Sequence, residues 1–248
     1  MTDLNKFGLL IRDSISGSEA QLQEVGYLYK MSFDDKLVGV NLTCSLCKQA
    51  VKEIEVINER EKEASAGDIS RIGAPMAYAR VYFEAFLYFI VGALDILASI
   101  NYYFMYREDN KTLKENYFRK QMGNFLKAPN INPEYAKLLS DNKRWIDDVH
   151  NNRNALAHKA SVFLSIDEQN RIMFSKRRPY DDKLTLDKLP REHLLQYLDA
   201  TLGKLLKFLD DYTMIHRKRV PISEETKNWF DIIERRNRVS SQSVSNES

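Results

Sequence analysis

Apolar side chains recur at helical spacing along most of the chain. Between about residues 35 and 64 they fall three or four positions apart, with polar side chains between them, which places them on one stripe of a long helix. This stripe consists of Leu37, Val40, Cys44, Cys47, Val51 and Ile54. A second stripe, formed by Leu194, Leu198, Leu202, Leu205, Leu209 and Tyr212, predicts another long helix from about Pro190 to Arg219.

A helix from about Ala74 to Tyr106 is apolar on nearly every face, which is typical of the central helix of a domain. Glu84 and Asp95 interrupt it on the same face, because eleven residues make about three turns. A buried carboxylate needs a cationic or hydrogen-bonding partner. The alternative is that both acids lie at the helix edge and reach water.

The remaining segments complete a helical pattern with one exception. A short helix is expected from Thr112 to Phe125 and a longer one from Pro133 to Ser161. After Ser161 the apolar period becomes two, so residues 161–175 predict a β-hairpin with a polar turn at 167–170. Residues 1–34 are ambiguous.

These elements predict an all-α fold, an antiparallel bundle of four to five main helices over residues 35–220, with a small β-hairpin inserted after the helix that begins at Pro133. We expect a last short helix within residues 221–236, capped by Ser223, and a disordered tail over residues 237–248.

Composition excludes several classes of protein. The 248 residues contain nine Gly and six Pro, too few for a turn-rich β architecture, and a net charge of +2 does not require nucleic acid. The two cysteines lie on the apolar stripe, which favours core packing over a metal or redox role. The longest apolar run, Ala85 to Leu94, is shorter than the roughly 20 residues that a membrane helix needs. We therefore expect a soluble, cytoplasmic protein without a membrane segment.

Candidate chemistry concentrates late in the helix that begins at Pro133. Asp147, Asn154 and His158 share one polar arc beside His150, and Arg153 lies where this arc meets the apolar side. His150 and His158 are about 12 Å apart along the axis, too far to ligate one zinc ion, so no metal or other cofactor is expected. Arginine, asparagine and histidine suit phosphodiester cleavage, in which histidine transfers protons and arginine stabilises charge on phosphorus.

The segment Arg153-Asn154 followed by three residues and His158 resembles the R-N-x-x-x-H form of the HEPN superfamily motif. The resemblance covers roughly residues 35–219 and includes the setting, with a long apolar helix carrying Leu94-Asp95 before the motif helix and another long helix after it. Members of this superfamily are all-helical and often homodimeric. Many are metal-independent ribonucleases of toxin–antitoxin, phage-defence and CRISPR systems, in which two motifs meet in a cleft.

The resemblance implies an endoribonuclease with Arg153, His158 and Asn154 as catalytic residues, and with Asp95 or Glu84 holding Arg153. It implies RNA as substrate, a homodimer, and an antitoxin or defence-system partner protein. The basic loop Lys176, Arg177 and Arg178, and the cluster at residues 217–219, either follow RNA phosphates or are ordinary solvated surface. Because some members of the superfamily lack nuclease activity, a non-catalytic nucleotide- or protein-binding helical module is the alternative.

Overall fold

The computed structural model describes residues 2–17, 20–63, 73–107, 117–158, 161–177, 191–220, 223, 224 and 226–228. Within these ranges, the side chains of residues 2–5, 20–21, 61–63, 158, 161–162 and 176–177 lie outside the description.

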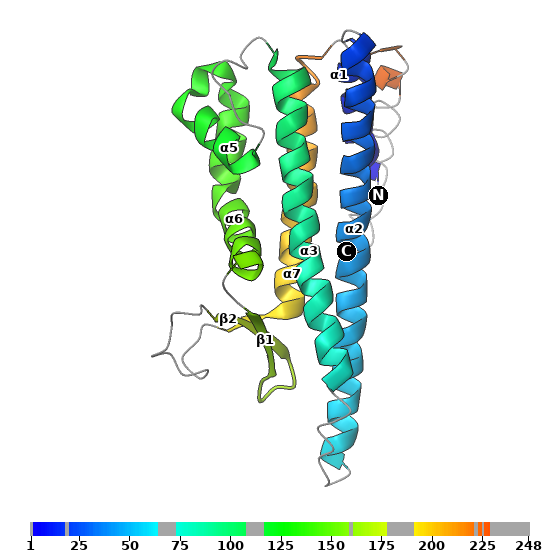
Figure 1. Cartoon of the computed structure of the whole chain (residues 1–248), viewed down its shortest axis with the longest axis vertical. Helices are drawn as coiled ribbons and strands as arrows, with labels where there is room; N and C mark the ends of the chain where they lie inside the picture. Colours follow the sequence, from blue (N-terminus) through cyan, green and yellow to red (C-terminus); the bar gives the residue numbers. More distant parts are fainter. Residues whose placement is uncertain are drawn as a thin grey trace, which may run out of the picture. The chain divides into compact units, whose positions relative to one another are not determined.

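The described chain is mostly helical, with one small sheet (Figure 1). Its elements are α1 (Thr2–Ser16), α2 (Ala20–Glu63), α3 (Gly73–Ile100), the π-helical turn η2 (Asn101–Met105), α5 (Phe118–Lys127), the 3-10 turn η4 (Pro129–Ile131), α6 (Pro133–His158), β1 (Ser161–Ile166), β2 (Ile172–Arg177), β3 (Glu192–His193) and α7 (Leu194–His216).

The chain divides into two compact units. Unit 1 comprises Met1–Phe33, Asp95–Asn142 and Leu205–Ser248, and unit 2 comprises Asp34–Leu94 and Lys143–Lys204. Each of the four long helices α2, α3, α6 and α7 contributes one portion to each unit, so the division does not follow a linker.

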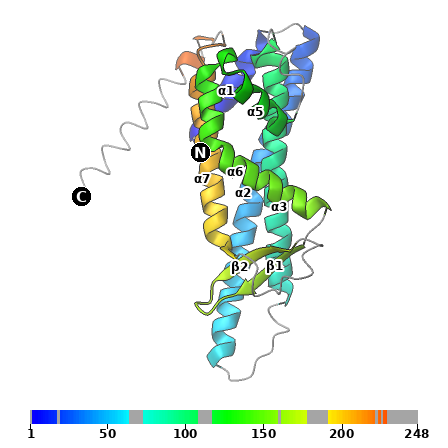
Figure 2. The same ribbon diagram turned by 90° about the vertical axis from the view of Figure 1, so that its left-hand side faces the viewer.

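The core of unit 2 forms where the stripe of α2 meets the apolar α3. Figures 1 and 2 show these parts of α2 and α3 running side by side. Cys44 and Cys47 are buried and free, as the stripe predicted, and the Cys47 thiol donates to the carbonyl of Ala79 at 3.3 Å. Burial raises the pKa of Cys47 to about 12, which makes it an unreactive core residue. At Gly39 a Cβ would lie 2.6 Å from the ring of Phe89, so glycine permits the close approach of the two helices.

A three-stranded antiparallel sheet, in the order β1-β2-β3, belongs to the same unit. The predicted hairpin is confirmed, with Ser161 paired to Arg177 and Ile166 paired to Ile172. Its turn is held by the Asp167 carboxylate, which accepts from the backbone N–H of Gln169 and Arg171. On the inner face of the sheet, Phe174 packs against Phe83 of α3 with ring centroids 4.8 Å apart.

Unit 1 is built around a buried polar network at the π-helical turn. The Asn101 amide donates to Gln121 Oε1 at 3.0 Å and to the Tyr135 hydroxyl at 3.1 Å, and its oxygen accepts from the Tyr212 hydroxyl. Asn101 is fully buried, so each of these bonds replaces one that water would otherwise supply. The turn leaves the regular helix at the residue whose side chain organises this network.

His216 is the second centre of that network and is also fully buried. Its Nδ1 lies 2.8 Å from the Tyr212 carbonyl and its Nε2 lies 2.5 Å from the Tyr106 hydroxyl. The carbonyl can only accept, so Nδ1 carries the proton and Nε2 accepts from Tyr106. Burial lowers the pKa of His216 to about 3, and the imidazole is neutral. This histidine is therefore a core residue rather than part of a basic surface cluster.

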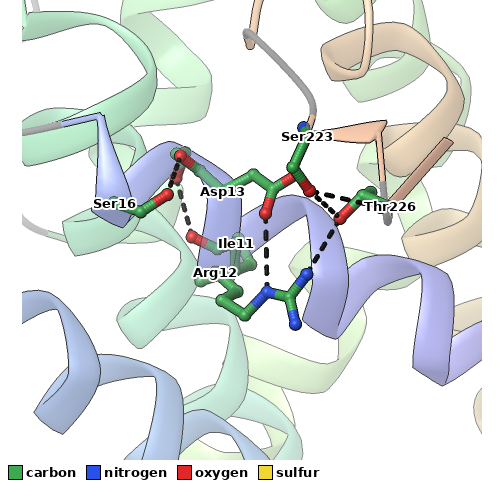
Figure 3. A network of polar contacts seen from close by, with 7 residues as sticks. Ile11, Arg12, Asp13, Ser16, Ser223 and Thr226 are labelled. Carbon is green, nitrogen blue, oxygen red and sulfur yellow. Dashed lines mark hydrogen bonds and ion pairs between the residues drawn. The ribbon is translucent and has the colours of Figure 1, made fainter.

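The segment after α7 is tied to α1 by a polar cluster (Figure 3). The buried Asp13 carboxylate accepts from the backbone N–H and the hydroxyl of Ser223, and Arg12 donates to the Thr226 hydroxyl at 3.1 Å. The Ser223 hydroxyl also accepts from the Thr226 N–H at 3.2 Å, which confirms its predicted role as a helix cap. The predicted tail at 237–248 lies outside the described residues.

Several predicted boundaries are wrong. Helix α2 begins at Ala20 rather than near residue 35, and it continues through Gly26. A Cβ at Gly26 would lie 2.7 Å from Ile15, so this glycine permits close packing instead. Helix α7 begins at Leu194, after a short third strand that the sequence pattern did not predict. The predicted helix at 112–125 is described from Phe118, where α5 begins.

Within the described ranges, one helical segment is long and apolar enough to cross a membrane by length and composition, Gly73–Met105. Of its most apolar window, 61% is buried inside the protein, and core helices of soluble proteins meet the same criterion.

The buried His216 predicts a pH-dependent stability. Its pKa is about 3 in the folded state against 6.5 for the free side chain, so between these values the unfolded chain binds the extra proton. Its contribution to stability is therefore nearly complete at pH 7 and falls as the pH falls, with a slope that approaches about 1.4 kcal/mol per pH unit from about one unit below 6.5. Urea unfolding at pH 7, 6 and 5 should show a loss that steepens between pH 6 and 5 for the wild type and a smaller loss for His216→Phe. Equal slopes would contradict the assignment.

Candidate functional site

The last turns of α6 present the motif with one side packed and one side open. Trp145, Ile146 and Val149 are buried on the packed side. Asn154 is exposed on the other side, and Arg153 is half-buried between them. The helix ends at His158, the last residue of the motif. The motif therefore occupies a helix end, where side chains have room to turn towards a ligand.

The Arg153 guanidinium is held by an aromatic ring and an amide. Its central carbon lies 5.6 Å from the ring centroid of Tyr88 on α3, within cation–π range. One terminal nitrogen donates to Asn154 Oδ1 at 3.0 Å. The Nε atom is buried and has no hydrogen-bond partner among the described residues. These contacts orient the guanidinium without cancelling its charge.

An acidic partner was predicted for Arg153, but the residue of α3 that contacts it is a tyrosine. The prediction was that Asp95 or Glu84 holds Arg153. Glu84 forms an ion pair with Arg80 of its own helix at 3.6 Å. An exposed arginine four residues away on the same helix face satisfies this carboxylate locally. Asp95 accepts a hydrogen bond from the Phe118 N–H at 3.1 Å, and so caps the first turn of α5 within unit 1. Tyr88, one turn after Glu84, contacts Arg153 instead.

The other predicted supporting residues lie apart from the guanidinium's contacts. Asp147 is half-buried and pairs with Lys143 one turn earlier in α6. His150 is buried, so its imidazole does not face solvent as a substrate-binding group would. Neither residue contributes to the observed contacts of Arg153.

Four of the predicted functional side chains fall outside what the structure describes. They are His158, Lys176 and Arg177, whose backbones belong to α6 and β2, and Arg178. The position of the His158 backbone five residues after Arg153 at the helix end is the part of their geometry that is described.

A partly buried polar network fixes the motif helix one residue before Arg153. The Tyr197 hydroxyl of α7 donates to Asp148 Oδ2 at 2.8 Å, and the Asn152 amide donates to both the Tyr197 oxygen at 2.8 Å and Asp148 at 3.2 Å. Burial, followed by the charge of Asp148, raises the pKa of Tyr197, so the hydroxyl keeps its proton and remains a donor. The ring of Tyr197 also packs on Phe83 and Phe174.

Sequence reasoning missed this network. Asp148 and Asn152 are four residues apart on one face, which would have indicated a local pair. Nothing in the sequence indicated Tyr197, because it lies beside the leucine stripe of α7 and is one of 13 tyrosines. Tyr88 was equally hidden, since an aromatic residue in an apolar helix normally reads as core.

The arrangement suits anion binding better than metal binding. The described residues hold no group of three or more His, Cys, Asp or Glu side chains that could bind a metal ion. A guanidinium without a carboxylate partner can donate two parallel hydrogen bonds to a phosphate. The described site is therefore a cationic, amide-lined helix end.

The network and the ion pair differ in their predicted contributions to stability. Tyr197→Phe removes one of the donors to the half-buried Asp148 carboxylate, so we expect a loss of about 0.5–1.5 kcal/mol in the free energy of unfolding. Glu84→Gln breaks a partly exposed pair between residues four apart, and we expect a change below about 0.5 kcal/mol. Urea unfolding of both variants and the wild type measures the contrast. A large loss for Glu84→Gln would show that this acid has a buried partner after all.

Comparison with known proteins adds no relative to this description. No family model matches the chain, and neither a curated protein nor a solved structure matches it.

Proposed function

We propose that this protein is a metal-independent endoribonuclease of the HEPN type, with Arg153 and His158 at a homodimer cleft. The observation that carries the proposal is the setting of Arg153. Among the described residues its guanidinium contacts Tyr88 and Asn154 and no carboxylate, so its positive charge stays available to a phosphate. The motif R-N-x-x-x-H supplies the second catalytic group, His158, at the same helix end.

The proposed reaction is an internal transfer at phosphorus. A base removes the proton of a ribose 2′-OH, and the 2′ oxygen attacks the adjacent phosphorus. The bond from phosphorus to the 5′ oxygen breaks, and an acid protonates that oxygen. The products are a 2′,3′-cyclic phosphate and a 5′-hydroxyl. Histidine can take either proton-transfer role near neutral pH, and arginine stabilises the charge that develops on the non-bridging oxygens.

A second copy of the chain would complete the proposed site. One His158 cannot be both base and acid in the same step, whereas two copies supply one group for each role. In this proposal Asn154 keeps the Arg153 guanidinium in place through the bond to its Oδ1. Lys176, Arg177 and Arg178 follow the RNA backbone, and the biological setting is a cytoplasmic toxin–antitoxin or phage-defence system with a partner protein.

The alternative proposal is a non-catalytic binding module. It is favoured by the network of Asp148, Asn152 and Tyr197, which gives the same stretch of α6 a structural role. In that case Arg153 serves packing through Tyr88, a contact worth about 0.5–1 kcal/mol at a partly exposed site. The two proposals differ in whether RNA is cut.

The two motif residues should be required for cleavage but not for folding. With purified protein, RNA and EDTA, we expect the wild type to cut RNA and His158→Ala or Arg153→Ala to lose activity by at least about 100-fold. A matched control is Arg144→Ala, an exposed arginine of the same helix outside the motif, which should retain activity. If the wild type leaves RNA intact, or cuts it as fast as His158→Ala does, the binding-module proposal is preferred.

Asn154→Asp provides a sharper test of the guanidinium. The change keeps the side-chain size and places a carboxylate where Arg153 now donates to an amide oxygen at 3.0 Å. The new ion pair should compete with phosphate, raising KM at least about tenfold. Because Asn154 is exposed, the free energy of unfolding should change by no more than about 0.5 kcal/mol. An unchanged KM would mean that Arg153 does not bind the phosphate.

A further inference from the structure

Part of α3 remains uncovered in unit 2 although the helix is strongly apolar. Tyr78 is 56% exposed, Val81 54% and Tyr88 44%, and all three lie on the side of the helix opposite the buried Phe83. Exposed apolar side chains that line up along one helix indicate a surface for a partner rather than scattered surface residues.

The exposed side chains belong to a stripe with a regular spacing. The stripe consists of Ala74, Tyr78, Val81, Ala85, Tyr88 and Gly92, separated by 4, 3, 4, 3 and 4 residues. This is the spacing with which one helix packs along another in a coiled-coil manner. The stripe is about 27 Å long on an ideal helix, and its own residues are uncharged. At its Gly92 end the Lys36 side chain of α2 packs close to the glycine, so that end is covered in part.

The order of residue sizes along the stripe is nearly the same in both directions. When two copies of the helix are placed antiparallel, Tyr78 of one lies opposite Tyr88 of the other and Ala74 lies opposite Gly92. Val81 lies opposite Ala85 at the middle. A two-fold interface requires a surface that is complementary to its own rotated copy. A stripe with this symmetry meets that condition when two copies of the helix run antiparallel.

The neighbouring helix extends the same surface. Val38 and Leu42 of α2 are 65% and 56% exposed. Gly39, next to Val38, contacts Phe89, so these side chains lie at the level of Ala85 and Tyr88. They point away from the core stripe of α2, on the outer side of the α2–α3 pair.

We propose that the exposed stripe of α3, from Ala74 to Gly92, is the surface through which two copies of this chain form an antiparallel, two-fold symmetric dimer. Val81 of each copy packs on Ala85 of the other near the axis, and Tyr78 of each packs on Tyr88 of the other. The nearest acidic group, Glu84, is paired with Arg80 of its own helix, which limits repulsion between the two copies.

This interface would bring both motif helices to one side of the dimer. When a two-fold axis relates two antiparallel helices, the same side of each helix lies on the same side of the dimer. Arg153 contacts Tyr88, and the two-fold axis places the two arginines on the same side of the dimer. The two Tyr88 positions are about 15 Å apart along the helices. The exposed stripe alone supports the dimer. The functional meaning of having both arginines on one side rests on the proposed ribonuclease activity.

The first test is the oligomeric state of the full chain. We expect analytical ultracentrifugation over about 1–200 µM to show a monomer–dimer equilibrium. Val81→Glu places two carboxylates beside the axis and should weaken association at least tenfold. The matched control is Val56→Glu, an exposed valine of α2 beyond the stripe, which should associate like the wild type. Circular dichroism verifies that both variants are folded.

Cysteine cross-linking tests the register. A mixture of Val81→Cys and Ala85→Cys proteins should form a disulfide-linked dimer, because these positions face each other. Val81→Cys alone should cross-link poorly, since its two copies are offset by about four residues and exceed the roughly 7 Å between Cα atoms that a disulfide spans. The native Cys44 and Cys47 are buried and do not compete.

Each contrary result overturns the proposal in a distinguishable way. A monomer at all concentrations rules out the dimer, and if that monomer sediments with phosphatidylcholine vesicles the stripe is a lipid surface. A dimer that Val81→Glu leaves intact places the interface elsewhere. Efficient cross-linking of Val81→Cys alone indicates parallel helices. None of these measurements depends on RNA cleavage, so they fail or succeed separately from the ribonuclease proposal.

Discussion

Burial of α3 is the constraint on which the rest of unit 2 depends. The helix is apolar on nearly every face, and it can be stable in water only if other elements cover it. The stripe of α2, the sheet residue Phe174 and the tyrosine of α7 at position 197 cover its inner side. The outer stripe remains exposed. Association with a second protein surface would bury this remaining apolar area.

The same helix determines how the motif is presented. Tyr88 belongs to the exposed stripe of α3, and it contacts Arg153. An aromatic face orients a guanidinium while leaving its hydrogen-bonding edges free, whereas a carboxylate would occupy them. Meanwhile the network of Asp148, Asn152 and Tyr197 fixes α6 one residue earlier. A guanidinium that is positioned by a fixed helix, with its hydrogen-bonding edge open, suits the binding of a phosphate.

The sequence predicted the elements whose signals are local and regular. The 3–4 spacing from Leu37 to Ile54, the alternation in the hairpin and the cap at Ser223 are each determined by neighbours in the chain, and the structure confirms them. Contacts between residues far apart in the sequence could not be predicted from it. Whether Glu84 meets Arg153 or Arg80 depends on which of two arginines is nearer in space, and the local one is. The burial of His216 depends on Tyr106 and Tyr212 closing around it, which its position among basic residues did not indicate.

The central claim is that the helix end at Arg153 and His158 supports RNA cleavage without a metal ion. The most direct measurement is the chemistry of the ends left on an RNA oligonucleotide after incubation with the purified protein in EDTA, determined by mass spectrometry. We expect fragments that end in a 2′,3′-cyclic phosphate and begin with a 5′-hydroxyl, which is the outcome of 2′-OH attack. Intact RNA, or fragments with 3′-hydroxyl and 5′-phosphate ends, would contradict it.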